Sequence, residues 1–451
     1  MKTAAFCRSH LPTHRTGERG VTMILVALSM VALIAMAALS IDVVTLYLAR
    51  EEAQRAADAG ALAAARVISV SGITGTTGPD TDPTSWTAIC GGATSLASTI
   101  AQAAAQENGV AGRAANLVTV TYSSGSGTAT ADCTAVPGDA QFGVNPLVTV
   151  LVTRSGMPTL FSRIWSRSTN TVSATATAEV LNPSNSGNYA PGGDAVPVTP
   201  RCVKPLIIPN KDPVNGGTFL VTGTGAIVNP GIRIGGGGTG TVGESFSLTD
   251  NCTGANCSPP AGMLSNPPAA GYYVPALVTS PAIAYPACAD DSNFQKAIGG
   301  CDQITQYACG TVGGAQWDSS INPGLASGDT STAAQCLIHQ NGQDSLDYSS
   351  YPYQMKAGPN NPIAPPNQLI TSSDSIVTLP IYDHTAGTGT LTSGTPITIL
   401  GFLQVFIDSV DTGTGNLNVH VLNIAGCGNV ASTTLSAPGT SPVPIRLITP
   451  Q

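Results

Sequence analysis

Charged residues are scarce in this 451-residue chain: Asp, Glu, Lys and Arg make up 10% of it, against about 25% in an ordinary soluble domain. Basic residues are the fewest, with 18 Lys and Arg against 26 Asp and Glu, whereas nucleic-acid binding needs clustered basic side chains. Aromatic residues make up 5%, while Gly (50) and Pro (33) are abundant, as in turn-rich β modules. The composition disfavours a cytosolic enzyme and a nucleic-acid partner, and the length favours more than one domain.

A long apolar run lies near the N-terminus, where the 21 residues from Val21 to Ile41 contain no charge. At a rise of ~1.5 Å per residue, this run is long enough to cross a hydrocarbon core ~30 Å thick. The tail before it holds four basic residues against the single Glu18, and the positive-inside rule places such a tail in the cytoplasm. The sequence predicts a cytoplasmic basic tail over 1–20, a single transmembrane helix over 21–41, and extracytoplasmic residues after it.

A cleaved secretory signal is the competing interpretation of this run. Ala35-Met36-Ala37 offers small residues in the arrangement that signal peptidase recognises, after a stretch of apolar positions. Apolar sequence nevertheless continues to Ile41, and the helical pattern does not stop at Asp42. The transmembrane interpretation is therefore preferred.

The helical pattern continues from 42 to 69, a segment that lacks Pro and is rich in Ala, Leu, Glu and Arg. We expect one helix from Val21 to Ile68, half in lipid and half projecting outward. Small residues recur along it at three- and four-residue spacing, which either permits close approach of another helix or reflects helix propensity alone. These residues are Ala53, Ala56, Ala57, Gly60, Ala61 and Ala64.

Cysteine usage agrees with an exported region. Cys7 lies in the basic tail, and an even number of cysteines in the remainder predicts disulfides. Cys90 and Cys133 are the two that precede a Pro/Gly-rich break near residue 190, so we expect them to pair, whereas the pairing of the others stays open. A zinc site is disfavoured because no closely spaced pair other than Cys252 and Cys257 is present. The ten disulfide candidates are Cys90, Cys133, Cys202, Cys252, Cys257, Cys288, Cys301, Cys309, Cys336 and Cys427.

The fold class predicted for the rest of the chain is α+β. Residues 70–181 are expected to form a small α+β module, 182–200 a Pro/Gly-rich linker, and 201–451 a β-rich, disulfide-containing extracytoplasmic domain. In the module we expect helices over 86–106 and 157–165 and strands over 116–122, 147–154 and 171–181. In the last domain we expect strands over 204–208, 218–222, 376–382, 397–407 and 417–422.

The span from Gly17 to Val67 resembles the N-terminal region of TadE/TadG-like Flp pilus-assembly proteins. Five features carry the resemblance: an Arg-Gly pair before the apolar run, the long apolar helix itself, Asp42 at its outer end, the sequence Leu-Tyr-Leu-Ala-Arg over 46–50, and the Ala-Ala-Asp-Ala run over 56–59. It implies a non-enzymatic, single-pass protein of the bacterial inner membrane, or a minor-pilin-like component. It also implies contacts with membrane lipid and with other pilus proteins through the N-terminal helix.

Prepilin-type processing is a further possibility that the resemblance raises. Gly20 would stand just before a cleavage point at Val21, but the fifth residue after Gly20 is Leu25, where pilins carry Glu. The sequence departs from the full prepilin signal at that position, and cleavage is therefore not the favoured interpretation.

Catalytic and cofactor motifs are weak in this sequence. The glycine-rich run over 238–243 fits G-x-G-x-x-G, but no convincing helix follows it, as a dinucleotide site requires. Asp383-His384 is more typical of a surface turn than of an acid/base pair. Four residues offer oxygen atoms near one loop without the spacing of an EF-hand: Asp408, Asp411, Asn416 and Asn418. We therefore predict no catalytic residue, no metal site and no cofactor.

The leading hypothesis is a membrane-anchored structural component of a Flp/Tad-type pilus assembly or adhesion apparatus. Its C-terminal region would lie in the periplasm or at the cell surface. The alternative is an exported hydrolase, or a carbohydrate-binding or adhesin protein, tethered by the same helix with its active part in residues 201–451.

Overall fold

The structure is a computed structural model that describes most of the chain after the basic tail. The described ranges are 18–75, 83–124, 128–136, 142–143, 146–157, 170–182, 198–233, 235, 237–250, 271–279, 292–305, 307–309, 315–318, 321, 328–349, 351–385, 396–427, 437–439 and 441–448.

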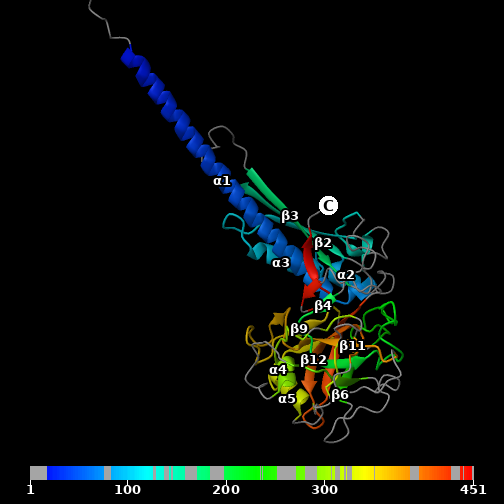
Figure 1. Ribbon diagram of the computed structural model, residues 1–451. Helices are drawn as coiled ribbons and strands as arrows, with labels where there is room; N and C mark the ends of the chain where they lie inside the picture. The colour runs from blue at the N-terminus through cyan, green and yellow to red at the C-terminus, as the bar shows by residue number, and fades with distance from the viewer. Residues whose placement is uncertain are drawn as a thin grey trace, which may run out of the picture.

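One long helix, α1 (Glu18–Val70), leads from the N-terminus into the body of the protein (Figure 1). Its 53 residues correspond to a length of about 80 Å at ~1.5 Å per residue. It contains no Pro and is built largely from Ala, Leu and other good helix formers. It ends where Gly72 takes a positive φ of 78°, followed by a short 3-10 turn, η1 (Ile73–Gly75). The expected continuous helix is confirmed.

The C-terminal half of α1 packs on a four-stranded antiparallel sheet and on α3 (Leu96–Glu107). The sheet order is β1-β2-β3-β15, and its long strands alternate buried and more exposed residues, as expected for a sheet covered on one face. Figure 1 shows β2 and β3 running beside the helix. The strands are β1 (Leu117–Ser123), β2 (Leu147–Met157), β3 (Asn170–Val180) and β15 (Ile445–Ile448).

The single helix predicted over 86–106 is wrong, because two helices occupy this region. α2 (Pro83–Cys90) is followed by a break, and α3 begins at Leu96. Gly92 in the break has a φ of 90°, which a residue with a side chain adopts only with strain. The helix predicted over 157–165 falls outside the described residues, except for Met157, which ends β2.

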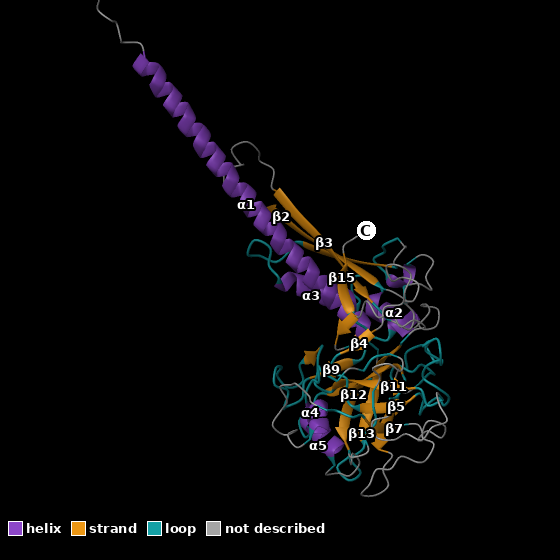
Figure 2. Cartoon of the chain, viewed as in Figure 1, coloured by secondary structure: helices purple, strands orange, loops and turns teal. Residues whose placement is uncertain are grey.

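The second body of the protein is built around a closed six-stranded barrel in the order β11-β12-β13-β6-β7-β5 (Figure 2). Apolar side chains from its strands fill the interior, together with residues from α4 (Asn293–Gly299) and α5 (Asp329–Leu337). The barrel strands are β5 (Leu206–Pro209), β6 (Ser245–Asp250), β7 (Tyr272–Pro275), β11 (Ile376–Tyr382), β12 (Ile399–Val410) and β13 (Leu417–Gly426).

Two smaller sheets complete the described structure. One has the order β10-β9-β8, and the other pairs β14 with β4. Their strands are β8 (Ser345–Asp347), β9 (Gln354–Lys356), β10 (Leu369–Ile370), β4 (Val198–Pro200) and β14 (Ala437–Gly439). The strand predicted over 218–222 is wrong: Leu220 makes only an isolated bridge to Ile227, because Val221 bonds locally to Ala226 and Gly225 in a tight turn.

The two bodies do not divide at a single point in the sequence. Strand β15, which comes from the region predicted to form only the second domain, pairs with β3 in the first sheet. Arg446 of β15 also donates a hydrogen bond to the carboxylate of Glu179 at 2.5 Å. Because β15 covers the edge of β3, it satisfies main-chain groups that would otherwise be open to other chains. Residues 70–181 therefore form the α+β sheet together with the end of the chain.

Candidate membrane anchor and its attachment to the body

The N-terminal half of α1 exposes apolar side chains on all its sides. Met23 is 78% exposed, and Ile24, Leu28 and Leu33 are each exposed by about 60%. The most apolar 18-residue window of the helix has a mean hydropathy of 2.7, and only 6% of it is buried within the protein. A surface of this size and composition favours contact with lipid or protein over contact with water. By length and composition, α1 is a helix that could cross a membrane.

Beyond Ile41 the helix becomes two-faced. Asp42 is only 5% exposed and is engaged in a polar interaction, and Ala38 and Ala49 on the same face are also buried. The opposite face still exposes Val43, Val44, Tyr47 and Leu48. The first charge after the apolar run is thus enclosed by the protein, and the exposed apolar surface continues seven residues beyond Ile41 on one side.

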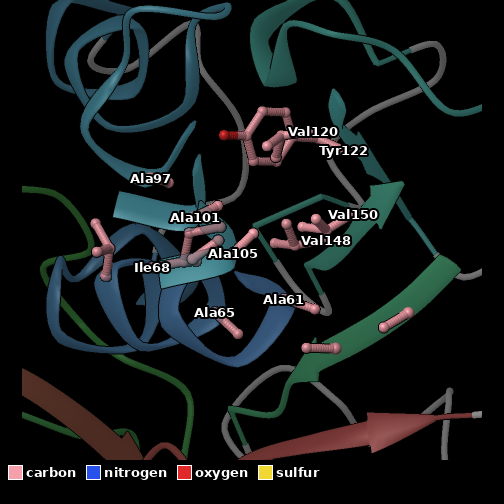
Figure 3. Close-up of a cluster of buried hydrophobic side chains, with 14 of the residues drawn as sticks. Ala61, Ala65, Ile68, Ala97, Ala101, Ala105, Val120, Tyr122, Val148 and Val150 are labelled. Carbon is pink, nitrogen blue, oxygen red and sulfur yellow. The ribbon is translucent and has the colours of Figure 1, made fainter. Parts of the chain in front are cut away.

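The small residues of α1 are buried within the chain itself. Ala53, Ala56, Ala57, Ala61 and Ala64 have no exposed surface. In Figure 3, Ala61 and Ala65 lie beside residues of α3 and β2, among them Ala101, Ala105 and Val150. A Cβ atom added to Gly60 would lie 3.0 Å from the Ala101 carbonyl oxygen and 3.2 Å from Val150 Cγ1. The close helix approach that these small residues permit is therefore made within the chain, to α3 and the sheet of its own module.

Hydrogen bonds attach α1 to both bodies of the protein. Glu52 accepts a 2.6 Å bond from the main-chain N–H of Ala111, and Gln54 donates to the carbonyl of Thr175. At the C-terminal end, the phenol of Tyr351 donates to the Ser71 carbonyl at 2.5 Å. The buried side chain of Asn182 reaches both Thr74 and the barrel residue Ile424. Together with the bond from Asn423 of β13 to the Ser69 carbonyl, these contacts join the inner half of the helix to the sheet and its end to the barrel.

Seven of the ten candidate cysteines lie in the described part of the chain, and all seven are disulfide-bonded. The expected bond between Cys90 and Cys133 is present and joins the end of α2 to a 3-10 turn, η3 (Cys133–Ala135). Cys202 pairs with Cys301 and Cys309 with Cys427, which resolves part of the pairing that the sequence left open. Cys336 is also disulfide-bonded. Cys252, Cys257 and Cys288 fall outside the described residues, as do Cys7 and the side chains at the start of α1.

The residues considered for calcium binding have other partners. Asp408 contacts the Nδ1 atom of His420, and Asp411 accepts main-chain hydrogen bonds from Gly413 and Thr414 in a turn. Asn418 is hydrogen-bonded to Ser409 and Ser247. Within the described ranges, no group of three His, Cys, Asp or Glu side chains is arranged to hold a metal ion.

The weak catalytic candidates also occupy structural positions. Asp383 accepts hydrogen bonds from the main-chain N–H and the hydroxyl of Thr385, as in an Asx turn. Burial, with the nearby Lys211, lowers the pKa of His384. The glycine-rich run over 238–243 leads into strand β6 and not into a helix, so it lacks the helix N-terminus that a pyrophosphate site uses.

A buried carboxylate pair beside the barrel was missed by sequence reasoning. Glu244 is fully buried, and its pKa is raised to about 8 by burial and by the charge of Asp212, against the smaller opposing effect of Arg233. Asn215 bonds to both carboxylates, and Arg233 Nη2 lies 3.6 Å from Glu244 Oε1. Neither the spacing nor the composition of this turn-rich region signals that these side chains converge.

The fold and its exposed helix define a protein in which one long, partly apolar helix packs on an α+β body and is hydrogen-bonded to a β-barrel. Residues 20–67 match the family model described as Flp pilus-assembly TadE/G-like. The match confirms the resemblance seen over Gly17 to Val67 and covers the helix only. No curated protein and no solved structure matches the chain.

Proposed function

We propose that this protein is a non-enzymatic, membrane-anchored structural component of a bacterial Flp/Tad-type pilus assembly or adhesion apparatus. The observation that carries the proposal is the coincidence of two features in α1. The helix exposes an uncharged apolar surface from Val21 to Ile41, and the same helix is the part of the chain that matches the pilus-assembly family. The α+β body and the barrel then lie outside the inner membrane.

Charge and cysteine chemistry support this orientation. The tail before Val21 carries four basic residues and one acidic residue, the bias typical of a cytoplasmic segment. The disulfides among the described residues lie on the other side of the apolar run, as expected of an oxidising compartment. A single-pass topology with the N-terminus in the cytoplasm satisfies both observations.

The rigid joint gives the anchor a mechanical role. The helix runs from Ile41 to Val70 without a break, about 45 Å at ~1.5 Å per residue, and over this length it is hydrogen-bonded to strand β3 and to barrel strand β13. The barrel is therefore held at a fixed distance and angle from the bilayer, as suits a scaffold.

Partner contacts in the membrane would use the exposed part of the helix. Because the small-residue stripe is occupied by the module, we assign these contacts to the apolar surface between Val21 and Leu48. Tyr47 lies near the outer end of this surface, where an aromatic side chain suits the membrane interface. Membrane lipid would cover the faces of the helix that no pilus protein contacts.

A helix replacement tests anchoring and partner contact separately. In one variant, residues 21–41 are replaced by a Leu/Ala helix of the same length, and in the other by a polar helix. The first variant should stay in the membrane fraction but lose co-purification with pilus-assembly proteins and reduce piliation. The second should leave the membrane. Unchanged piliation after deletion of the whole gene, with no pilus protein co-purifying, would refute the proposed function.

A further inference from the structure

A cavity of about 400 Å³ lies where the last turns of α1 meet the barrel. Its wall is built from segments far apart in the sequence: the end of α1, the residues before β5, the ends of α4 and α5, the start of β11 and the middle of β12. Its volume falls in the range of small-molecule sites. The lining residues that matter most are Arg66, Lys204, Gly300, Asp374, Thr378 and Gln404.

Arg66 brings a cation with no partner in the described part of the chain. No hydrogen bond or ion pair joins its guanidinium to any described residue, although the residue is partly buried. Burial lowers the pKa of Arg66, but a guanidinium remains protonated under physiological conditions. Its planar donors match the two oxygens of a carboxylate.

Lys204, in the segment before β5, brings a second cation to the cavity. Its Nζ atom donates to the carbonyl oxygen of Gly300 at 2.5 Å and lies 3.5 Å from that of Ala297, both at the C-terminal end of α4. These carbonyls stabilise the ammonium and leave one of its three N–H donors for the cavity. Burial lowers the pKa of Lys204 to about 8, so the ammonium form of Lys204 predominates at neutral pH.

The cavity also presents an acceptor that lacks a donor. Gln404 is 2% exposed, and its Oε1 atom has no hydrogen-bond partner among the described residues. Asp374 adds a negative charge to the wall, although its carboxylate lies 3.2 Å from His339 Nε2 and is largely solvated. Two cations and one carboxylate leave a net charge of about one in the wall, which favours a singly charged anion over phosphate. The Gln404 acceptor favours a ligand that carries an N–H group beside that anion.

We propose that this cavity binds the carboxylate end of an amino acid or of a peptide chain. Arg66 and Lys204 hold the carboxylate oxygens, and Gln404 Oε1 accepts the N–H of the same residue. The ligand lies between the anchor helix and the barrel, so its binding strengthens the joint between them.

Small probes on the full chain in detergent micelles test this assignment by isothermal titration calorimetry. N-acetylglycine carries the carboxylate and amide of a peptide end, glycine is the free amino acid, and N-acetylglycinamide lacks the carboxylate. We expect saturable binding of one or both carboxylates and affinity weaker by about tenfold or more for the amide. Preference for N-acetylglycine identifies a peptide end, and preference for glycine a free amino acid.

Three variants localise the binding. Arg66→Gln should weaken carboxylate binding by about tenfold or more, whereas Arg55→Gln, on an exposed position of the same helix, should leave it unchanged. Gln404→Leu should weaken binding of N-acetylglycine even if Arg66→Gln does not fold. The proposal is overturned if no carboxylate probe binds at millimolar concentration, if inorganic phosphate binds and the carboxylates do not, or if Arg66→Gln and Gln404→Leu both fold and bind as the parent does.

Discussion

The side-chain amide of Asn423, in strand β13 of the barrel, donates a hydrogen bond to the main-chain carbonyl of Ser69 in the last turn of α1. The two residues are 354 positions apart in the sequence, and both are fully buried. A carbonyl at a helix end needs such a partner, because no later helical N–H reaches it. The barrel thus binds the end of α1 directly.

Replacing Asn423 by Leu should loosen this joint. The Ser69 carbonyl would stay buried without its donor, which costs about 1–3 kcal/mol of unfolding free energy. Denaturant unfolding of the full chain in micelles measures the change. Thr412→Ala, on the exposed turn between β12 and β13, serves as the control and should change the stability little. Equal stability of the Asn423→Leu variant and the parent would show that the bond does not matter.

Close packing of α1 gives a second prediction. Gly60→Leu should destabilise the protein by about 1–3 kcal/mol or more, because its Cβ alone already approaches Ala101 and Val150 closely. Ala103→Leu introduces the same side chain at an exposed position of α3, where there is room for it. Thermal unfolding compares the two variants. A Gly60→Leu protein as stable as the Ala103→Leu protein would contradict the packing described for the stripe.

The disulfide between Cys90 and Cys133 closes 43 residues of chain. Its loss through the double replacement Cys90→Ala and Cys133→Ala should lower the unfolding free energy by about 4 kcal/mol, from the loop entropy released in the unfolded state. Cys7→Ala should have no such effect, since Cys7 precedes α1 and lies far in the sequence from this loop. Chemical denaturation without reductant checks both. A double variant that keeps the parent's midpoint would rule out a stabilising role.

The buried Glu244 predicts how stability depends on pH. Its pKa rises from an ordinary 4.5 to about 8 in the folded protein because of burial and the nearby Asp212. The folded state therefore binds more protons than the unfolded state between these values, and this carboxyl's contribution to stability is lost as pH rises from about 4.5 through 8. The melting temperature of the parent should therefore fall over this pH range, and the Glu244→Gln variant should show a smaller fall.

The control for this prediction is Glu107→Gln, at an exposed position on α3. It should leave the pH profile between 5 and about 8 close to that of the parent. Parallel profiles for the parent and the Glu244→Gln variant across this window would contradict the raised pKa of Glu244 and the burial that causes it.

Regular periodicity made several elements predictable from the sequence. The alternation of Val with Thr or Ala predicted the bounds of β2 and β3 to within a few residues. The strand predicted over 376–382 coincides with β11. The uninterrupted Ala-rich pattern gave α1. Local pattern is enough for such elements because it sets which side of a strand or helix is buried.

Long-range pairing was not predictable in the same way. Nothing in the sequence of Ile445 to Ile448 indicates that it returns to β3, and the closure of the barrel depends on strands as distant as β5 and β11. The cavity combines Arg66 and Lys204 from separate bodies. A single lysine directly before the apolar sequence of β5 could have indicated that Lys204 is buried. It could not have indicated which residues lie around Lys204.

The topology of the full chain tests the central claim most directly. Spheroplasts that carry the Thr412→Cys variant are treated with a membrane-impermeant maleimide, and mass spectrometry locates the label. We predict that the protein fractionates with the inner membrane, that position 412 is labelled in intact spheroplasts, and that Cys7 is labelled only after detergent is added. Labelling of Cys7 from outside, or recovery of the protein in the soluble fraction, would contradict a single membrane-spanning anchor with a cytoplasmic N-terminus.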